Sequence, residues 1–148
     1  MVKACYPGQM TGALDDPLHR VRADLARNGI LRLFGAEVVH LQLGEVDLAL
    51  AFRDEVGQHH GFFHGGVLAT LLDVACGMAA LSLMAPGQSV VTAEFKVNFL
   101  QPAQGLRLLV QGRVVRTGRL LSVCTGNAYV GERHVALMQA TMASVPQR

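Results

Sequence analysis

The spacing of apolar residues changes twice along the chain. Between residues 14 and 28, apolar residues recur every three or four positions, after the start Asp15-Asp16-Pro17 and before Gly29. An acidic cap, a proline in the first turn and a glycine at the end are typical of a helix. We predict a short amphipathic helix here, packed on the outside of the domain.

From Ala36 the apolar residues instead recur every second position, which is the period of a strand. A first strand is expected near 36–42, a turn at Gly44-Glu45, and a second strand over 46–52. A polar loop over 54–63 follows, ending in two phenylalanines.

The same two-residue period returns after position 90. Over 92–99 it predicts that Thr92 and Glu94 face one way, and Phe95 and Val97 the other. Glycine-containing turns then separate three further predicted strands, which run near 107–114, 119–130 and 133–144.

Between these strand regions, residues 65–84 are apolar except for Asp73 and a few small polar groups, and Pro86-Gly87 ends the run. The length is near that of a membrane span. However, inserting Asp73 into a bilayer would cost about 2.5–3.5 kcal/mol of free energy. In addition, no Lys or Arg flanks the segment to anchor it at the membrane surface. We therefore predict no membrane association and a buried core helix, since a helix apolar on all sides must be enclosed.

The order helix, two strands, long helix and at least three strands predicts an α+β fold. Hairpin-length turns imply an antiparallel sheet, and the simplest arrangement curves this sheet around the one long central helix. We expect a single domain over 1–148, with 1–30 as an N-terminal extension that carries the short helix.

Composition narrows the classes of function. Of the 148 residues, 51% are hydrophobic and 16% charged, and the net charge is +2. This apolar excess suggests a subunit interface. Basic residues form no block, and aromatic residues are only 5%, so nucleic acid is not an expected partner. The three cysteines are odd in number and far apart, and the first ten residues lack an apolar leader, so we expect a cytoplasmic protein without disulfides.

Asp73 is the residue that a core helix does not explain, because aspartate is almost never fully buried without a partner. Its neighbours three, four or seven positions away on the same side are small: Ala69, Thr70, Cys76, Gly77 and Ala80. Such a thin face admits a ligand or a partner subunit. The alternative is that Asp73 accepts a hydrogen bond inside the core.

His64-Gly65-Gly66 begins the predicted helix. The first N–H groups of a helix have no intrahelical partner and carry the positive end of the dipole, so an oxyanion could bind there. The alternative is an ordinary turn. His59, His60 and His64 do not match metal-ligand spacing, so no metal is predicted. Cys76 is expected to be a small core residue.

Together, residues 57–83 and 90–105 resemble the PaaI-like acyl-CoA thioesterase family of the hotdog fold. The resemblance covers roughly 36–145 and rests on HGG, an acidic residue nine positions after the histidine, and the strand pattern T-x-E-F-x-V-x-F-L-x-P. It implies a long helix wrapped by an antiparallel sheet. It also implies dimers that join two sheets, often paired into tetramers, with active sites built from both chains.

The resemblance also assigns roles to five residues. It implies that Asp73 is the nucleophile or general base, and that the Gly65 N–H polarises the thioester carbonyl. Gln58 matches an amide near the carbonyl and water, His64 helps hold the carbonyl site, and Thr92 can orient water. Family members have Asp or Glu at the carboxylate position, so the choice between nucleophile and base stays open.

Further residues are candidates for binding the substrate. Gly66, Phe62, Phe63 and Met78 could line an apolar acyl pocket, although the last three could equally be core residues. Four arginines could bind the phosphates of coenzyme A: Arg113, Arg116, Arg119 and Arg133. Alternatively, these arginines could simply form a solvent-exposed face of strands and turns.

The predicted function is hydrolysis of an acyl-CoA thioester to a carboxylic acid and free coenzyme A, with no cofactor. Two alternatives remain: a hotdog hydratase or dehydratase, and a protein that binds acyl-CoA or another apolar ligand without turnover. The acyl group, which could be aryl, hydroxyaryl or medium-chain, is left open by the sequence.

Overall fold

The computed structural model describes residues 16–147, so the predictions that concern Cys5, Leu14 and Asp15 lie outside the described residues. The described part contains three α-helices, one 3-10 turn and six strands. In chain order they are α1 (Pro17–Arg27), α2 (Gly29–Phe34), β1 (Glu37–Gln42), β2 (Glu45–Ala51), the 3-10 turn η1 (Asp54–Val56), α3 (Gly65–Leu81), β3 (Gln88–Phe99), β4 (Arg107–Thr117), β5 (Leu121–Val130) and β6 (Arg133–Pro146).

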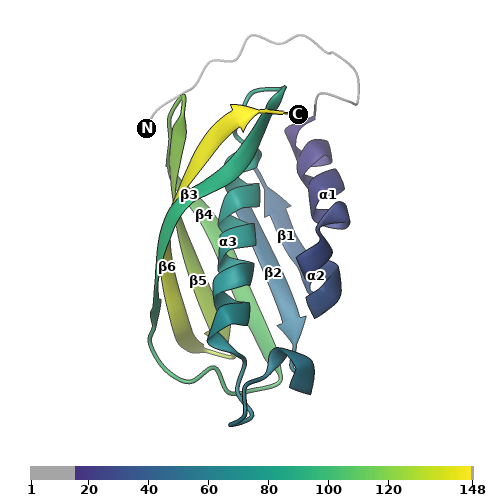
Figure 1. Cartoon of the computed structure of the whole chain (residues 1–148), viewed down its shortest axis with the longest axis vertical. Helices are drawn as coiled ribbons and strands as arrows, with labels where there is room; N and C mark the ends of the chain where they lie inside the picture. Colours follow the sequence, from purple (N-terminus) through teal and green to yellow (C-terminus); the bar gives the residue numbers. More distant parts are fainter. Residues whose placement is uncertain (1–15, 148) are drawn as a thin grey trace.

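All six strands form one antiparallel sheet in the order β1-β2-β4-β5-β6-β3. The sheet curves around α3, while α1 and α2 lie beside it near β1 (Figure 1). The predicted α+β hotdog fold is therefore confirmed. In the part of the chain that the structure describes, no helix is long and apolar enough to cross a membrane.

The central helix lies directly on two paired glycines of the sheet, Gly112 on β4 and Gly126 on β5. A Cβ atom added at Gly112 would lie 2.4 Å from the carbonyl carbon of Ala75, and one added at Gly126 would lie 2.8 Å from Leu72 Cδ2. Both distances are shorter than real contacts. At Gly112 only glycine allows the backbone of α3 to come this close, and at Gly126 glycine leaves room for the Leu72 and Cys76 side chains of α3. The approach fixes which face of α3 is buried.

The opposite side of α3 is not enclosed, contrary to the expectation from its apolar composition. Leu71, Leu72 and Ala75 are fully buried, but Thr70 and Asp73 are only partly covered. Asp73 and five other residues form this open face of α3: Gly66, Ala69, Thr70, Val74 and Met78. In a single chain, Asp73 is thus half-buried rather than enclosed.

The N-terminal helix begins as predicted, with Asp16 accepting a hydrogen bond from Leu18 N at 3.0 Å and with Pro17 at the first position. Gly29, however, was predicted to end this helix but is instead the first residue of α2. Asn28 ends α1 and its side chain also caps α2, which the sequence reading missed. The Arg20 guanidinium donates to the carbonyl of Leu81, the last residue of α3, and to those of Met84 and Ala85 just after it, which anchors α1 to the end of the central helix.

The predicted alternation along β3 is wrong at its start. Thr92 lies opposite Met142 and Glu94 lies opposite Thr141, so Ala93 forms a β-bulge. The bulge shifts the alternation by one residue, and Thr92 therefore faces α3 on the same side as Phe95. Without it, the strand could not direct both a threonine and the later phenylalanines towards the helix.

Gly112→Ala should destabilise the protein by about 3 kcal/mol, because the new methyl group would overlap the α3 backbone, which cannot rotate away. Thermal or urea unfolding measures this loss. Gly29→Ala is the matched control, since the nearest atom to its added Cβ is the end of a flexible side chain at 3.9 Å. Equal stability of the two variants would contradict the close packing of α3 on the sheet.

Candidate active site

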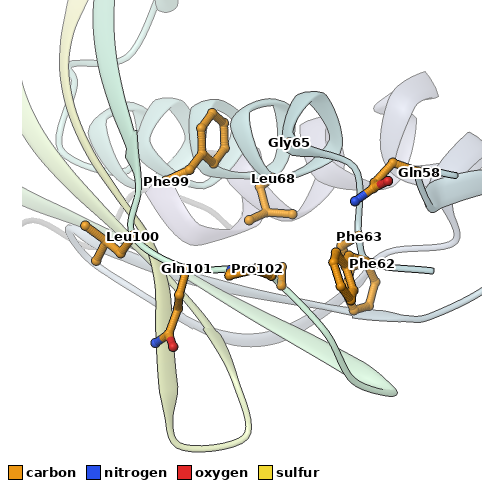
Figure 2. Close-up of a pocket in the computed structure, with 10 residues that line it drawn as sticks. Gln58, Phe62, Phe63, Gly65, Leu68, Phe99, Leu100, Gln101 and Pro102 are labelled. Atoms are coloured by element: carbon orange, nitrogen blue, oxygen red, sulfur yellow. The ribbon is translucent and has the colours of Figure 1, made fainter. Parts of the chain in front are cut away.

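A small hairpin before α3 fixes the orientation of Gln58. Gly57 pairs with Phe63 across the hairpin, and Gly61, at φ 78°, closes its turn. Gln58 Oε1 accepts a hydrogen bond from His60 N at 2.7 Å. Because this bond occupies the oxygen, the amide nitrogen is left to face the pocket, as Figure 2 shows. Gln58 therefore offers a donor to a bound oxygen atom.

The first turn of α3 leaves one N–H group available. His64 is the N-cap, and its Nδ1 accepts from Gly66 N at 2.9 Å. The N–H groups of Val67 and Leu68 donate to the His64 carbonyl. Among the described residues, the Gly65 N–H has no acceptor. At the positive end of the helix dipole, this N–H is suited to a carbonyl oxygen that gains negative charge.

Both donors adjoin a pocket of about 420 Å³ at the start of α3 (Figure 2). It lies between the hairpin, the first turn of α3 and the segment after β3. The lining residues are Gln58, Phe62, Phe63, Gly65, Leu68, Phe99, Leu100, Gln101, Pro102 and Ala103. The structure thus brings four of the predicted site residues together: Gln58, Phe62, Phe63 and Gly65.

Phe99 explains why residue 65 is glycine. A Cβ atom added at Gly65 would lie 3.2 Å from Cζ of the Phe99 ring, so any side chain at position 65 would require this ring to shift. The sequence reading used Phe99 only as part of a strand pattern and assigned it no role. The F-L-x-P run that follows the strand was the available signal, since all of its residues line the pocket.

The carboxylate lies elsewhere on the helix. Thr92 Oγ1 donates to Asp73 Oδ1 at 2.7 Å, and Met142 Sδ lies 3.6 Å from the same hydroxyl. Thr92 therefore orients the Asp73 carboxylate itself, whereas the sequence reading assigned it to water. The Ala93 bulge makes this contact possible, because it directs Thr92 towards α3.

Within one chain, the carboxylate and the carbonyl site are far apart. Asp73 follows Gly65 by eight residues on the same helix, which separates them by about 12 Å along its axis. Met78 is further along, about 20 Å from Gly65, and it does not line the pocket. Gly66 lies on the open face, where its N–H is engaged by His64.

The remaining candidates lie outside the pocket. Arg113 forms ion pairs with Asp47 and Glu45, and its hydrogen bond with Asp47 raises the pKa of the guanidinium further. Arg116 is exposed on β4, while Arg133 donates to the Gln104 carbonyl beside the pocket segment.

Two further groups of residues do not add reactive chemistry. The His59 and His60 rings contact each other, with centroids 4.0 Å apart, and no cluster suited to a metal ion occurs among residues 16–147. Burial, with contributions from Cys124 and Asp73, raises the pKa of the Cys76 thiol far above its usual value, so this thiol is not a thiolate nucleophile.

Comparison with known proteins decides the family. Residues 60–137, which are more than half of the chain, match the thioesterase superfamily. The chain belongs to the thioesterase superfamily. The match includes the second half of the hairpin, the whole of α3, strands β3 to β5 and the start of β6. It therefore contains Gly65, Asp73 and Thr92 but not Gln58.

Solved structures agree with this membership. A thioesterase family protein from Silicibacter pomeroyi is 41% identical, with a TM-score of 0.86, over 88% of this chain and 99% of that one. The PaaI protein of Escherichia coli, from the phenylacetic acid degradation operon, shares the fold at 18% identity, with a TM-score of 0.79, over 90% and 96% of the two chains. The predicted PaaI-like hotdog resemblance is confirmed.

Relatives with named activities support hydrolysis. A protein of Halobacterium salinarum that is named as an esterase is 32% identical over 77% of this chain and 79% of its own. The 1,4-dihydroxy-2-naphthoyl-CoA hydrolase of Listeria monocytogenes is 25% identical over 64% and 77%. Together with the superfamily membership, these relatives support thioester hydrolysis in general.

His64→Ala should lower the free energy of unfolding by about 1 kcal/mol, because the Gly66 N–H would lose its cap. His64→Asn should restore most of this loss, since a side-chain oxygen can accept the same hydrogen bond. Urea unfolding of the three proteins measures both changes. Identical losses in the Ala and Asn variants would show that the histidine does not act as a cap.

Proposed function

We propose that this protein hydrolyses acyl-CoA thioesters in active sites that two copies of the chain build together. One observation carries the proposal: the unpaired Gly65 N–H adjoins a pocket, whereas the oriented Asp73 carboxylate lies about 12 Å away on the open face of the same helix. A single chain separates the two halves of a hydrolytic site, and a second chain can reunite them.

The carbonyl half of the site stabilises developing negative charge. The thioester oxygen accepts hydrogen bonds from the Gly65 N–H and from the Gln58 amide, both of which are already oriented before substrate binds. Preorganised donors of this kind favour the tetrahedral intermediate over the planar thioester, because its oxygen carries a full charge.

Asp73 of the second copy supplies the other half. As a general base, it takes a proton from water while the water oxygen attacks the carbonyl carbon. As a nucleophile, it attacks the carbon directly, and water then hydrolyses the resulting anhydride. In both routes the C–S bond breaks, coenzyme A leaves as a thiolate that is then protonated, and the acid is released. The Thr92 hydroxyl fixes the carboxylate for either route.

The surface beside Asp73 is suited to a second copy. The open face of α3 adjoins β3, the last strand of the sheet, which has no neighbouring strand on its outer side among residues 16–147. Apolar side chains on and just after this strand are 42–55% exposed: Val91, Phe95, Phe99 and Leu100. Pairing two β3 strands would bury these side chains and join two sheets, whether as a dimer or as part of a tetramer.

A hotdog hydratase fits these contacts less well, because it needs a histidine that works with a carboxylate on the same acyl thioester. His64 Nδ1 is already occupied by the helix cap. The matched Listeria relative, named as a coenzyme A thioester hydrolase, supports coenzyme A thioesters as the substrates.

Asp73→Asn should reduce kcat for acyl-CoA hydrolysis by about 10²- to 10⁴-fold, because the amide can neither attack nor accept the proton from water. Thr92→Val should reduce kcat about tenfold, because the carboxylate stays in place but loses the hydrogen bond that orients it. Free-thiol release over a panel of acyl- and aryl-CoAs measures both effects.

Thr141→Val is the matched control, because it removes a similar threonine–carboxylate hydrogen bond to Glu94, which lies on the outer face of the sheet. This variant should keep the wild-type rate. A folded Asp73→Asn variant with near-wild-type turnover would refute the proposed mechanism. Tight acyl-CoA binding without any thiol release from the wild type would instead indicate a binding protein.

A further inference from the structure

We infer that a groove between the N-terminal helices and β1 binds a free long-chain carboxylic acid, both by its carboxylate and by its apolar tail. This site goes beyond the proposed function, which would only supply such an acid as its product. One wall of the groove carries positive charge, and the other carries exposed apolar side chains.

The groove has a volume of about 690 Å³, which is within the range of small-molecule sites. It forms because the chain turns twice before β1: Asn28 ends α1 and caps α2, and Gly35, at φ 70°, ends α2. The two helices therefore lie beside β1 (Figure 1). Leu25 and Leu31 line the groove from below and are only 5% and 3% exposed.

The helix wall of the groove is positively charged. Arg22 and Ala26 are one turn apart on the same side of α1, and both line the groove. Arg32 Nη1 donates to the Ala26 carbonyl at 3.1 Å, which places its guanidinium on the same wall. Arg22 forms no hydrogen bond or ion pair with a protein acceptor within residues 16–147. Its guanidinium is therefore available to an anion.

No negative charge on the walls compensates these two arginines. Among the described residues, no acidic side chain lines the groove. The third basic residue there, His40, lies with its Nε2 atom 3.4 Å from Glu45 Oε2, so it already has a neighbour of opposite charge. A bound anion would thus be held by the arginines of the helix wall.

The strand wall is apolar although it is exposed. Val38 and Val39 line the groove and are 43% and 45% exposed. β1 is an edge strand, and a bulge between Val38 and His40 interrupts its pairing with β2. Edge strands are usually protected by charged side chains. Two adjacent exposed valines are instead suited to the apolar surface of a ligand.

A cationic wall opposite an apolar wall fits a ligand with one anionic head and an apolar tail. A guanidinium binds a carboxylate through two parallel hydrogen bonds, and the valines and leucines can cover a hydrocarbon chain. No Phe, Tyr or Trp of the described part of the chain lines the groove, so a nucleotide base has no such ring on which to stack. The free acid therefore fits better than its coenzyme A thioester.

The groove is separate from the proposed active site. In the sheet formed by residues 16–147, β1 and β3 are the two edge strands. The proposed pairing of two chains uses β3, so the groove lies at the opposite edge. A released acid can bind there while the next thioester is hydrolysed.

Calorimetry with dodecanoate and the full-length protein tests the site, with the active site saturated by a non-hydrolysable dodecyl thioether of coenzyme A. We expect a single dodecanoate on each chain, and an affinity that falls about two- to fourfold for each methylene group removed from the tail. Dodecyltrimethylammonium, which has the opposite charge, should not bind. Binding of dodecyl phosphate but not of dodecanoate would assign the groove to a phosphate headgroup and overturn the inference.

Variants on α1 tie this binding to the groove. Arg22→Ala should weaken dodecanoate binding at least about tenfold, because it removes a charged hydrogen-bond donor. Ala26→Glu, at an exposed position, should abolish binding because it places a carboxylate on the helix wall. Arg27→Ala is the matched control, since it removes the same charge from the same helix but lies outside the groove. Equal affinities of these folded variants and the wild type would overturn the inference.

A dodecanoic acid with a diazirine at the end of its tail locates the site directly. After irradiation, mass spectrometry should find the label within residues 36–41, and excess dodecanoate should prevent the labelling. Labelling confined to residues 57–68 or 99–103 would place the acid in the pocket at the start of α3 and overturn the inference.

The groove and the proposed function fail independently. Thiol release from acyl-CoAs without labelling of β1 would overturn the acid site and leave the proposed function intact. Dodecanoate binding beside β1 without thiol release from any thioester would reject the proposed function, whereas the acid site would stand.

Discussion

The central helix approaches the sheet so closely that no side chain fits between them at Gly112, and at the neighbouring Gly126 the gap is filled by the Leu72 and Cys76 side chains of the helix. This contact fixes the rotation of α3 about its axis. It turns the leucines of the helix into the core, together with Cys76, Gly77 and Ala80, and leaves Ala69, Thr70 and Asp73 only partly covered. It also fixes the height of the helix, so that its first turn meets the 57–63 hairpin and the segment after β3, where the pocket forms.

The chemistry follows from this placement. One helix carries a polarising N–H at its start and a carboxylate two turns later, and a rigid helix cannot bring the two together. Each group is nevertheless oriented within the single chain. His64 accepts a hydrogen bond from the Gly66 N–H and leaves the Gly65 N–H available, and Thr92 donates a hydrogen bond to the Asp73 carboxylate. The exposed apolar residues of β3 lie beside these groups. The proposed pairing of two chains would cover that surface and complete the site in one step.

The strands could be predicted from their two-residue alternation, and α3 from the length of its apolar run, which together indicated the fold. It could not predict the bulge at Ala93, since a bulge is defined by the partner strand and not by the strand itself. The short helix α2 was missed because six residues give too little periodicity. The Gly65 N–H could be suspected from sequence, but only the hydrogen bonds around it show that it is unpaired. The F-L-x-P run marks the segment that includes Phe99 and Pro102, but only the structure shows that this segment meets the start of α3 and the hairpin to form a pocket.

The central claim is that each active site combines the Gly65 side of one chain with Asp73 of another, and mixed oligomers test it most directly. Asp73→Asn and Gln58→Ala are each expected to be nearly inactive alone, the latter because it removes an oxyanion donor. Co-expressed in equal amounts, they should recover about a quarter of the wild-type kcat, since random pairing makes half of the dimers mixed and each mixed dimer has one intact site. A mixture no more active than the two separate variants would show that the carboxylate and the carbonyl site do not come from different chains.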